Sequence, residues 1–484
     1  MTVAWIERFR GSAGCGRVLR FFDSNYFPIC LCAAALVSNT LGLDIAGYAV
    51  FVACAVFINL FSDQTRAGIP VLLLGVFSTS AMHSPGYSDG SNFYMTAPVL
   101  ATLGSFAVIL ACSLVFHLTY YGGWRRMLRG SRLLPGLVVL CGATMLNGLF
   151  SPHYRPVNLL IGLLQLFSLL LVYLFFSATY RYDKKDLVYL ARICALAGIL
   201  IAVELLFVYT AKYEWGSPLN NDWKGQIIIG WGVSNIIGIM MVILLPMYFY
   251  LMQADKPRGW LYYIGAVAVT VAIFYTLSRA AFFLALPVFF AGAAISCLLK
   301  GNRRLYQIMT GAIAAAAVVV GVLLFDSGLI DELLGFFKEV KLNDRGRFEL
   351  WKKDIDFFLA YPLFGGGFAV EQVVNMPHRP IFHTFSHNTV MQMLGKCGLI
   401  GLAAYLYHCA DTVRLYLTRP TLDRLFMGAS VACFVITGLL DNGFFYVFTT
   451  FYYSLFLLFT ERGLEAEDAA AFRGSPLCKP KRPL

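Results

Sequence analysis

Apolar runs of about 18 to 25 residues recur from residue 28 almost to the end of the chain, and they constrain the fold more than any other feature. A run of this length crosses the hydrocarbon core of a bilayer as an α-helix, which satisfies its backbone hydrogen bonds within the segment. Hydrophobic residues make up 59% of the 484 positions and charged residues only 13%, a composition too apolar for a soluble chain of this size. The sequence therefore predicts an all-α, polytopic transmembrane helix bundle.

The apolar runs predict about fourteen spans. They lie near residues 28–43, 44–61, 67–82, 97–119, 133–150, 157–179, 187–210, 227–252, 259–277, 280–299, 305–325, 388–408, 425–441 and 444–460. If these spans alternate from a cytoplasmic N-terminus, 25 of the 38 Lys and Arg residues fall in cytoplasmic segments and 4 in short outer loops. Positive charge holds loops on the cytoplasmic side, so the distribution supports this orientation. We expect both termini to be cytoplasmic and the chain to be a multi-pass protein of a bacterial inner or plasma membrane.

The longest polar stretch between spans divides the chain into five predicted parts. These are a cytoplasmic N-terminal tail (1–27), transmembrane helices 1–11 (28–325), a large outer loop (326–386), transmembrane helices 12–14 (387–460) and a cytoplasmic tail (461–484). Within the loop, residues 329–340 and 347–360 carry apolar side chains at helical spacing with charges between them. We expect two amphipathic helices there, lying over the outer membrane surface.

Charge and cysteine content exclude several other classes. The formal net charge of +11 could suggest nucleic acid, but the basic residues sit mainly in short linkers between apolar runs, where membrane topology explains them. We expect no nucleic-acid partner. Most of the 12 cysteines lie inside apolar runs and no CxxC pair occurs, so neither a disulfide framework nor a zinc ribbon is indicated.

Three of the arginines on the predicted outer side are candidates for a binding site. Arg279, in the sequence LSRAAFF, falls at the outer junction of two spans, where positive-inside placement does not explain it. Arg345 and Arg347 lie in the outer loop, and Arg347 shares a helix face with Trp351 four residues later. A snorkelling or solvated arginine is the ordinary interpretation of each. If they converge, their guanidinium groups would bind phosphate oxygens in bidentate fashion.

His387 opens the twelfth predicted span, with Asn388 beside it to orient the imidazole or a ligand. A histidine at this position is either a hydrogen-bonded interfacial residue or a base that takes a proton from an attacking hydroxyl. The nearby His378 and His383 raise a metal-site alternative, but prolines interrupt any helix that would pair them. We expect no metal and no cofactor.

Other polar groups lie in apolar surroundings, and the sequence gives them no role. They are Asp441 and Asn442 between the last two spans, Glu204 within the seventh, and Arg192 near its cytoplasmic end.

Four stretches resemble the O-antigen ligase and polymerase superfamily of membrane glycosyltransferases. They are GWGVSNIIGIMMVILLP from Gly230, SRAAFF from Ser278, GRFELWKKDIDFFLAYPLFGGG from Gly346 and SHNTVMQMLGKCGLIGL from Ser386. Their order, and the long outer loop among them, make the set more specific than any one stretch. The resemblance covers about the C-terminal half and implies a GT-C-like helical bundle.

The resemblance implies a metal-independent glycosyltransferase of surface polysaccharide biosynthesis. Its partners would be a polyprenyl-pyrophosphate-linked glycan donor, a glycan or lipid-glycan acceptor and the bilayer. His387 would act as the catalytic base or orient the acceptor, and Arg279 with Arg347 or Arg345 would bind the pyrophosphate. Asn388 and Trp351 would support them. Lys396 departs from the pattern, since an acidic or apolar residue is more usual there.

Two other function classes fit a chain with many spans. A transporter or lipid-linked glycan flippase would carry its charged groups along a mid-membrane cavity, often with repeat symmetry, and the sequence has no evident repeat. A membrane scaffold would lack converging basic side chains. Within the leading class, the sequence leaves polymerase and ligase both open, along with the sugar, the linkage and the final acceptor.

Overall fold

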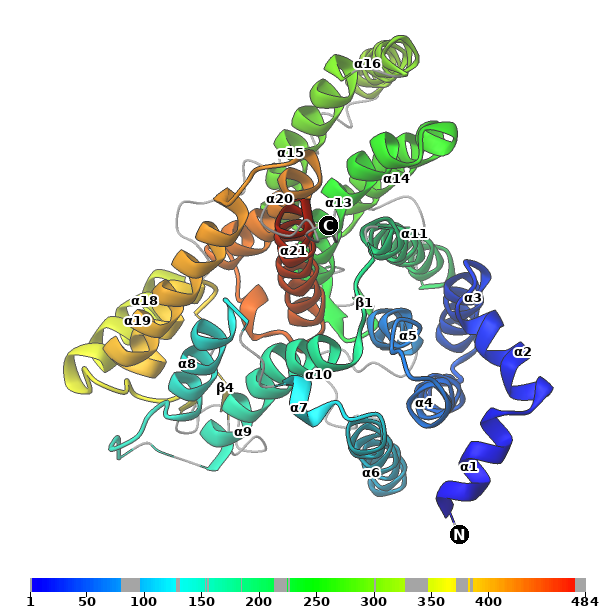
Figure 1. Cartoon of the computed structure of the whole chain (residues 1–484). Coiled ribbons are helices and arrows are strands. Elements are labelled where there is room, and N and C mark those ends of the chain that lie inside the picture. Colours follow the sequence, from blue (N-terminus) through cyan, green and yellow to red (C-terminus); the bar gives the residue numbers. More distant parts are fainter. Residues whose placement is uncertain are drawn as a thin grey trace, which may run out of the picture.

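The computed structural model describes residues 2–79, 96–127, 131–152, 154, 156–183, 185–212, 224, 227–299, 302–326, 347–370, 382–383 and 386–474. These residues form an all-helical bundle with two very short hairpins, which confirms the predicted fold class (Figure 1). Nine of the helices within these ranges are long and apolar enough to cross a membrane, or ten if the pair α2 and α3, bent by 77°, counts as one span.

The first half of the chain contributes short helices as well as full spans. Its elements are α1 (Thr2–Arg10), α2 (Ala13–Phe22), α3 (Tyr26–Leu41), α4 (Asp44–Phe61), α5 (Gly68–Gly75), η1 (Val76–Ser78), α6 (Ala97–Tyr120), α7 (Trp124–Met127), α8 (Leu134–Met145), α9 (Pro156–Gln165), η3 (Leu166–Leu171), α10 (Val172–Thr179) and α11 (Asp186–Lys212). The predicted N-terminal tail is thus largely helical, and Ser12 caps α2 by accepting a hydrogen bond from the backbone N–H of Cys15.

The second half contains the helices that surround the candidate site. Its elements are β1 (Ile228–Ile229), β2 (Gly232–Val233), α13 (Ser234–Ala254), η4 (Lys256–Arg258), α14 (Gly259–Tyr275), α15 (Arg279–Leu298), α16 (Arg303–Asp326), α18 (Arg347–Ala360), β3 (Ala369–Val370), β4 (Phe382–His383), α19 (Thr389–Leu417), α20 (Leu422–Gly438), η5 (Gly443–Phe445) and α21 (Val447–Gly474). Strand β1 pairs antiparallel with β2, and β3 with β4.

Each of the fourteen predicted spans coincides with helical structure, although not every helix is long enough to cross a bilayer alone. The segments Gly68–Ser78 and Leu134–Met145 are shorter apolar helices, and α20 has 17 residues. The number of membrane crossings therefore stays a prediction. In the stretch 326–386, predicted to be an outer loop, α18 forms where the second amphipathic helix is expected, whereas the first, at 329–340, lies outside the described residues.

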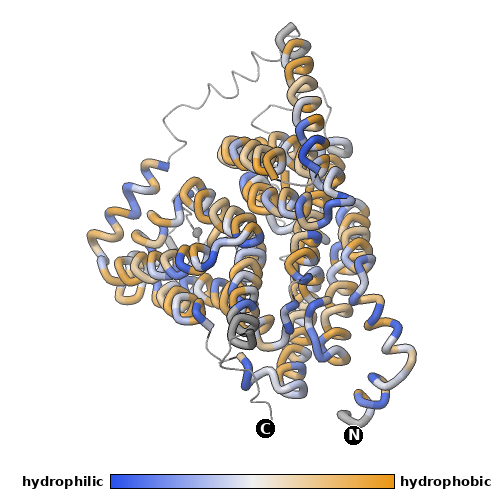
Figure 2. Tube along the Cα trace, turned by 45° about the horizontal axis from the view of Figure 1, so that its top comes forward, coloured by the Kyte–Doolittle hydropathy of each residue, from blue (hydrophilic) through white to orange (hydrophobic). Residues whose placement is uncertain are grey.

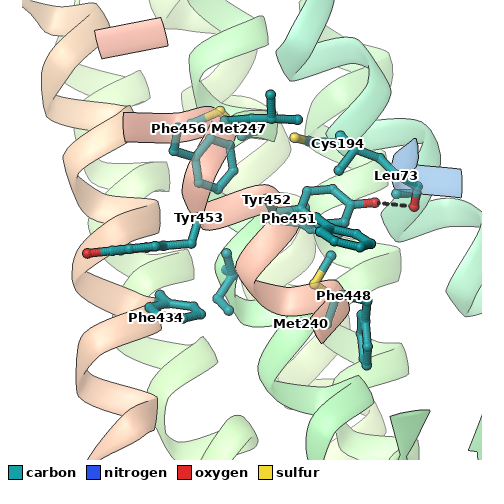
Figure 3. Close-up of a cluster of buried hydrophobic side chains, with 14 of the residues drawn as sticks. Leu73, Cys194, Met240, Met247, Phe434, Phe448, Phe451, Tyr452, Tyr453 and Phe456 are labelled. Atoms are coloured by element: carbon teal, nitrogen blue, oxygen red, sulfur yellow. Dashed lines mark hydrogen bonds between the residues drawn. The ribbon is translucent and has the colours of Figure 1, made fainter. Parts of the chain in front are cut away.

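Helix α13 forms the centre of the bundle. It passes through the middle of the molecule beside α21 in Figure 1. In its most apolar stretch of 18 residues, 94% of the residues are buried. Figure 3 shows part of the surrounding core, where Met240 and Met247 pack among aromatic side chains of α20 and α21. There the hydroxyl of Tyr452 donates a hydrogen bond of 3.0 Å to the carbonyl of Leu73. This packing holds the middle of α13 among α20 and α21.

Peripheral helices expose apolar rather than polar side chains. In α6 and in α16, only 6% of the residues in the most apolar stretch of 18 residues are buried. Both helices lie at the edge of the bundle in Figure 1. In Figure 2, hydrophobic residues run along most of the helical lengths and hydrophilic ones gather mainly near helix ends. An apolar helix surface is compatible with lipid as the surrounding solvent.

Candidate functional site

His387 lies in the turn that leads into α19, with its backbone in the left-handed region at φ 49°. The next residue, Asn388, caps the helix: its Oδ1 accepts a hydrogen bond of 3.0 Å from the N–H of Met391. Its Nδ2 donates to the carbonyl of Leu439 at 3.0 Å, so the turn is tied to the end of α20. A non-glycine residue in this conformation needs a neighbourhood that holds it, and both contacts of Asn388 contribute to that.

The imidazole of His387 pairs with a carboxylate from another helix junction. Its Nδ1 lies 3.0 Å from Oδ1 of Asp441, which follows α20 in the chain. The Asp441 side chain is 4% exposed, whereas that of His387 is 37% exposed. Because an ionised carboxylate only accepts hydrogen bonds, the contact places the proton on Nδ1 and leaves Nε2 as the proton acceptor of the neutral ring. This is the tautomer that a general base needs.

Asp441 keeps its charge despite being buried. Burial by itself raises the pKa of this carboxyl, but the hydrogen bond and charge of His387, the backbone N–H of Asn442 and the charge of Arg347 lower it by more. The pKa of Asp441 consequently lies below its ordinary value. The influence of Arg347 also shows that the start of α18 lies within electrostatic range of the His387 and Asp441 pair, which we call the His–Asp pair.

A hydrogen bond and an ion pair hold helix α18 against α19 and the turn before it, and these contacts position Arg347. The indole Nε1 of Trp351 donates a hydrogen bond of 2.8 Å to the carbonyl of Ser386, directly before His387. Farther along, the carboxylate of Asp354 lies 3.3 Å from Nζ of Lys396 in α19, and both side chains are buried. The two helices run side by side in Figure 1. Trp351 thus contacts the backbone directly before His387, and its supporting role stays a prediction.

The loop that follows α18 packs against a break in helix α19. At Gly398 the backbone takes φ 68° and ψ −162°, which interrupts the helix. The loop N–H of Gly366 donates 2.8 Å to the carbonyl of Gly395, and the N–H of Leu399 donates 2.8 Å to the carbonyl of Pro362. The glycine run therefore joins α18 to α19, since the loop supplies partners for backbone groups freed by the break.

Arg279 is the first residue of α15 and is partly buried, with its Nη2 atom inside the protein. The turn before it is bonded to the start of α13, where the hydroxyl of Ser234 donates to the carbonyl of Thr276 at 2.5 Å. Ile239 lies farther along α13. Its side chain would be 3.6 Å from a Cβ added to Gly443, and Gly443 follows Asp441 by two residues. Arg279 thus lies at the same end of the bundle as the His–Asp pair. Its convergence with His387 stays a prediction.

Some of the residues singled out in the sequence lie outside the described part of the structure. They are Arg345, His378 and the side chain of His383. Among the residues that the structure does describe, no group of three or more His, Cys, Asp or Glu is placed to hold a metal ion.

Sequence reasoning missed the role of Asp441. The signal available was weak: an Asp-Asn pair between two apolar runs, on the same predicted side of the membrane as His387. The two residues are 54 positions apart, and no sequence spacing indicates that residues so far apart form a pair. The partner of Lys396, Asp354, was missed for the same reason.

Comparison with known families gives an independent result. Residues 264–406 match a family model described as O-Antigen ligase. This segment is similar to the O-antigen ligase family, which supports the resemblance seen in the sequence. No curated protein matches the chain significantly.

The O-antigen ligase segment runs from within α14 into α19. It contains Arg279, Arg347 and His387, while Asp441 lies beyond its end. The match, together with the apolar helices long enough to cross a membrane, supports a multi-pass membrane enzyme of surface polysaccharide biosynthesis.

Proposed function

We propose that this protein is a glycosyltransferase of the O-antigen ligase and polymerase kind, which transfers a glycan from a polyprenyl-pyrophosphate carrier to an acceptor hydroxyl on the outer leaflet. The observation that carries the proposal is the His–Asp pair, with the Nδ1 of His387 held by Asp441 at 3.0 Å. This contact leaves Nε2 to accept a proton, and the charge of Arg347 contributes to the lowered pKa of Asp441.

In the proposed reaction, the acceptor oxygen attacks the anomeric carbon of the donor sugar. Nε2 of His387 takes the hydroxyl proton as the new carbon–oxygen bond forms, an effect worth about 10² to 10⁴ in rate. The bond between the anomeric carbon and the pyrophosphate oxygen breaks, and the polyprenyl pyrophosphate leaves with the electron pair.

The leaving group needs charge neutralisation more than protonation. Arg347, and Arg279 from the same end of the bundle, would supply fixed positive charge to the pyrophosphate oxygens. Arginine suits this role because it stays charged at any working pH. Arg345 is an additional candidate from the same loop. No metal is required in this mechanism, because the arginines take the part that a cation would play.

The proposal is tested by replacing His387 or Arg347 with Ala in the native host and analysing the surface polysaccharide by gel. We expect loss of polymer or of its attachment, with normal protein levels in the membrane. Lys352→Ala is a matched control, since Lys352 is an exposed basic residue of the same helix, α18. Unchanged amount and length of polymer in the His387 variant would defeat the catalytic assignment.

A further inference from the structure

A cavity of about 330 Å³ lies between α3, α11, α13 and α14, far from the His–Asp pair. It is lined by the first residues of α3 and α14, the first half of α11 and Tyr248 near the end of α13. These helices lie next to one another along one side of the bundle in Figure 1. Since α13 has 21 residues, about 30 Å separates its two ends, so the cavity opens at the opposite end of the bundle from the candidate active site.

The walls of the cavity are apolar and fixed in shape. Ile29, Leu196 and Leu261 are among the side chains that line it. Tyr248 forms one wall, and its hydroxyl donates a hydrogen bond of 2.5 Å to the carbonyl of Ala195. A Cβ at Gly265 would lie 2.7 Å from the Tyr248 ring, so the glycine is what lets this ring pack where it does. A preformed apolar groove of this size is suitable for a hydrocarbon chain.

Two arginines lie at one end of the cavity. Arg192 and Arg258 line it, and no carboxylate is among its described lining residues. The neighbouring Asp255 lies 2.8 Å from Arg192 and 3.8 Å from Arg258, so one carboxylate serves two guanidinium groups. Arg258 is 64% exposed and has capacity for a further anion.

Unused donors occur at the same place. The hydroxyl of Tyr189 and Nε of Arg192 are buried without a hydrogen-bond partner within the described part of the chain, and both residues line the cavity. Tyr189 is 4% exposed, and Arg66 covers its ring at 4.2 Å while pairing with Asp186. A buried donor without a partner costs stability, so these groups point to a ligand that accepts hydrogen bonds.

We propose that this cavity binds an anionic glycerophospholipid. Its phosphate would accept hydrogen bonds from Arg258, Arg192 and Tyr189, and one acyl chain would lie along the apolar walls. Basic pockets between transmembrane helices on the cytoplasmic side are suited to acidic headgroups. The predicted topology places this end at the cytoplasmic leaflet, across the membrane from the glycan transfer site. The inference is independent of the proposed catalysis, because it uses other residues.

The test measures lipid binding to the purified full-length chain by native mass spectrometry in detergent. The two probes are phosphatidylglycerol and phosphatidylcholine with identical acyl chains, and inorganic phosphate alone forms a third arm. We expect phosphatidylglycerol to bind the wild type about tenfold more tightly than phosphatidylcholine, the range of one charge-assisted contact. Arg258→Glu should remove this preference, and Tyr189→Phe should weaken it severalfold.

Arg304→Glu is the matched control, because Arg304 is an exposed arginine at the start of α16 that does not line the cavity. It should keep the wild-type preference. Equal binding of the two lipids by the wild type would overturn the proposal, as would an Arg304→Glu variant that loses as much preference as Arg258→Glu. Binding of inorganic phosphate as tight as that of phosphatidylglycerol would show an anion site and would also overturn the lipid assignment.

Discussion

At the scale of single residues, the account depends on how His387 is oriented. Its backbone conformation, at φ 49°, and its hydrogen bond to Asp441 fix both the position and the tautomer of the ring. A carboxylate in this role does not need to contact substrate. Asp441 is therefore a positioning residue, and His387 is the group expected to contact the acceptor.

Asp441→Asn should lower the transfer rate by at least about tenfold, because an amide neither fixes the tautomer nor stabilises the imidazolium as a carboxylate does. The effect should fall on kcat rather than on KM for the donor, measured with purified enzyme. Asp356→Asn, on the exposed surface of α18, is a suitable control. A variant in which only KM rises would indicate that Asp441 acts in binding instead.

The lowered pKa of Asp441 also predicts how stability varies with pH. A group whose pKa is lower in the folded state stabilises the fold fully above its unfolded value, about 4 for aspartate, and loses that contribution as pH falls through the folded value. The thermal stability of the wild type should therefore approach that of Asp441→Asn below about pH 4. If the difference between them grew on acidification, the assigned direction of the pKa would be wrong.

At the scale of elements, the contact between α18 and α19 positions Arg347. It contains a buried ion pair, Asp354 with Lys396, and Nζ of Lys396 also lies 4.7 Å from the centre of the Phe357 ring. The exposed residues of α18 include the apolar Phe348 and Leu359 as well as the charged Lys352 and Asp356. A helix that exposes both apolar and charged side chains is suited to a membrane surface.

Lys396→Met should destabilise the protein by about 3 to 5 kcal/mol, because it leaves the Asp354 carboxylate buried without its partner. The double variant Asp354→Leu with Lys396→Met should regain most of that stability, since a buried ion pair replaced by apolar groups is often neutral. Thermal unfolding in detergent measures both. Equal destabilisation by the single and double variants would show that the pair itself is not what matters.

Gly398→Ala should also separate α18 from α19. The added Cβ would lie 2.5 Å from backbone atoms of Leu363, and this positive-φ conformation, essentially restricted to glycine, costs another residue about 1 to 3 kcal/mol. Gly311→Ala in α16 is the matched control, because nothing lies within 4 Å of its added Cβ. We expect lower thermal stability and less polysaccharide only for Gly398→Ala. Equal behaviour of the two variants would contradict the assigned role of the break.

At the scale of the whole molecule, the sequence predicts the helical architecture better than the site. Apolar runs mark the long helices of the bundle, since a lipid environment requires a continuous apolar surface and internal backbone bonding. They do not mark α1, α2 or α7. The break at Gly398 and the His–Asp pair are products of tertiary packing between distant segments, so no local pattern indicates them. Arg347 and His387 could be singled out because charged groups near a membrane need a reason.

The orientation of the bundle is a separate prediction of the charge distribution. Fluorescent protein fused after residue 484 should fluoresce, as it does only in the cytoplasm, and alkaline phosphatase fused within the outer loop, after residue 346, should be active. The reverse pattern would place the His–Asp pair on the cytoplasmic side. Transfer on the outer leaflet would then be excluded.

The most direct test of the account is transfer by the purified chain reconstituted in vesicles. The reaction contains a polyprenyl-pyrophosphate-linked glycan, an acceptor glycan and a metal chelator, and both the new glycosidic product and released polyprenyl pyrophosphate are measured over time. The account predicts equal amounts of the two products from the wild type, and a rate about 10² to 10⁴ lower for His387→Ala. Translocation of the lipid-linked glycan without any new glycosidic bond, or transfer by His387→Ala at the wild-type rate, would contradict it.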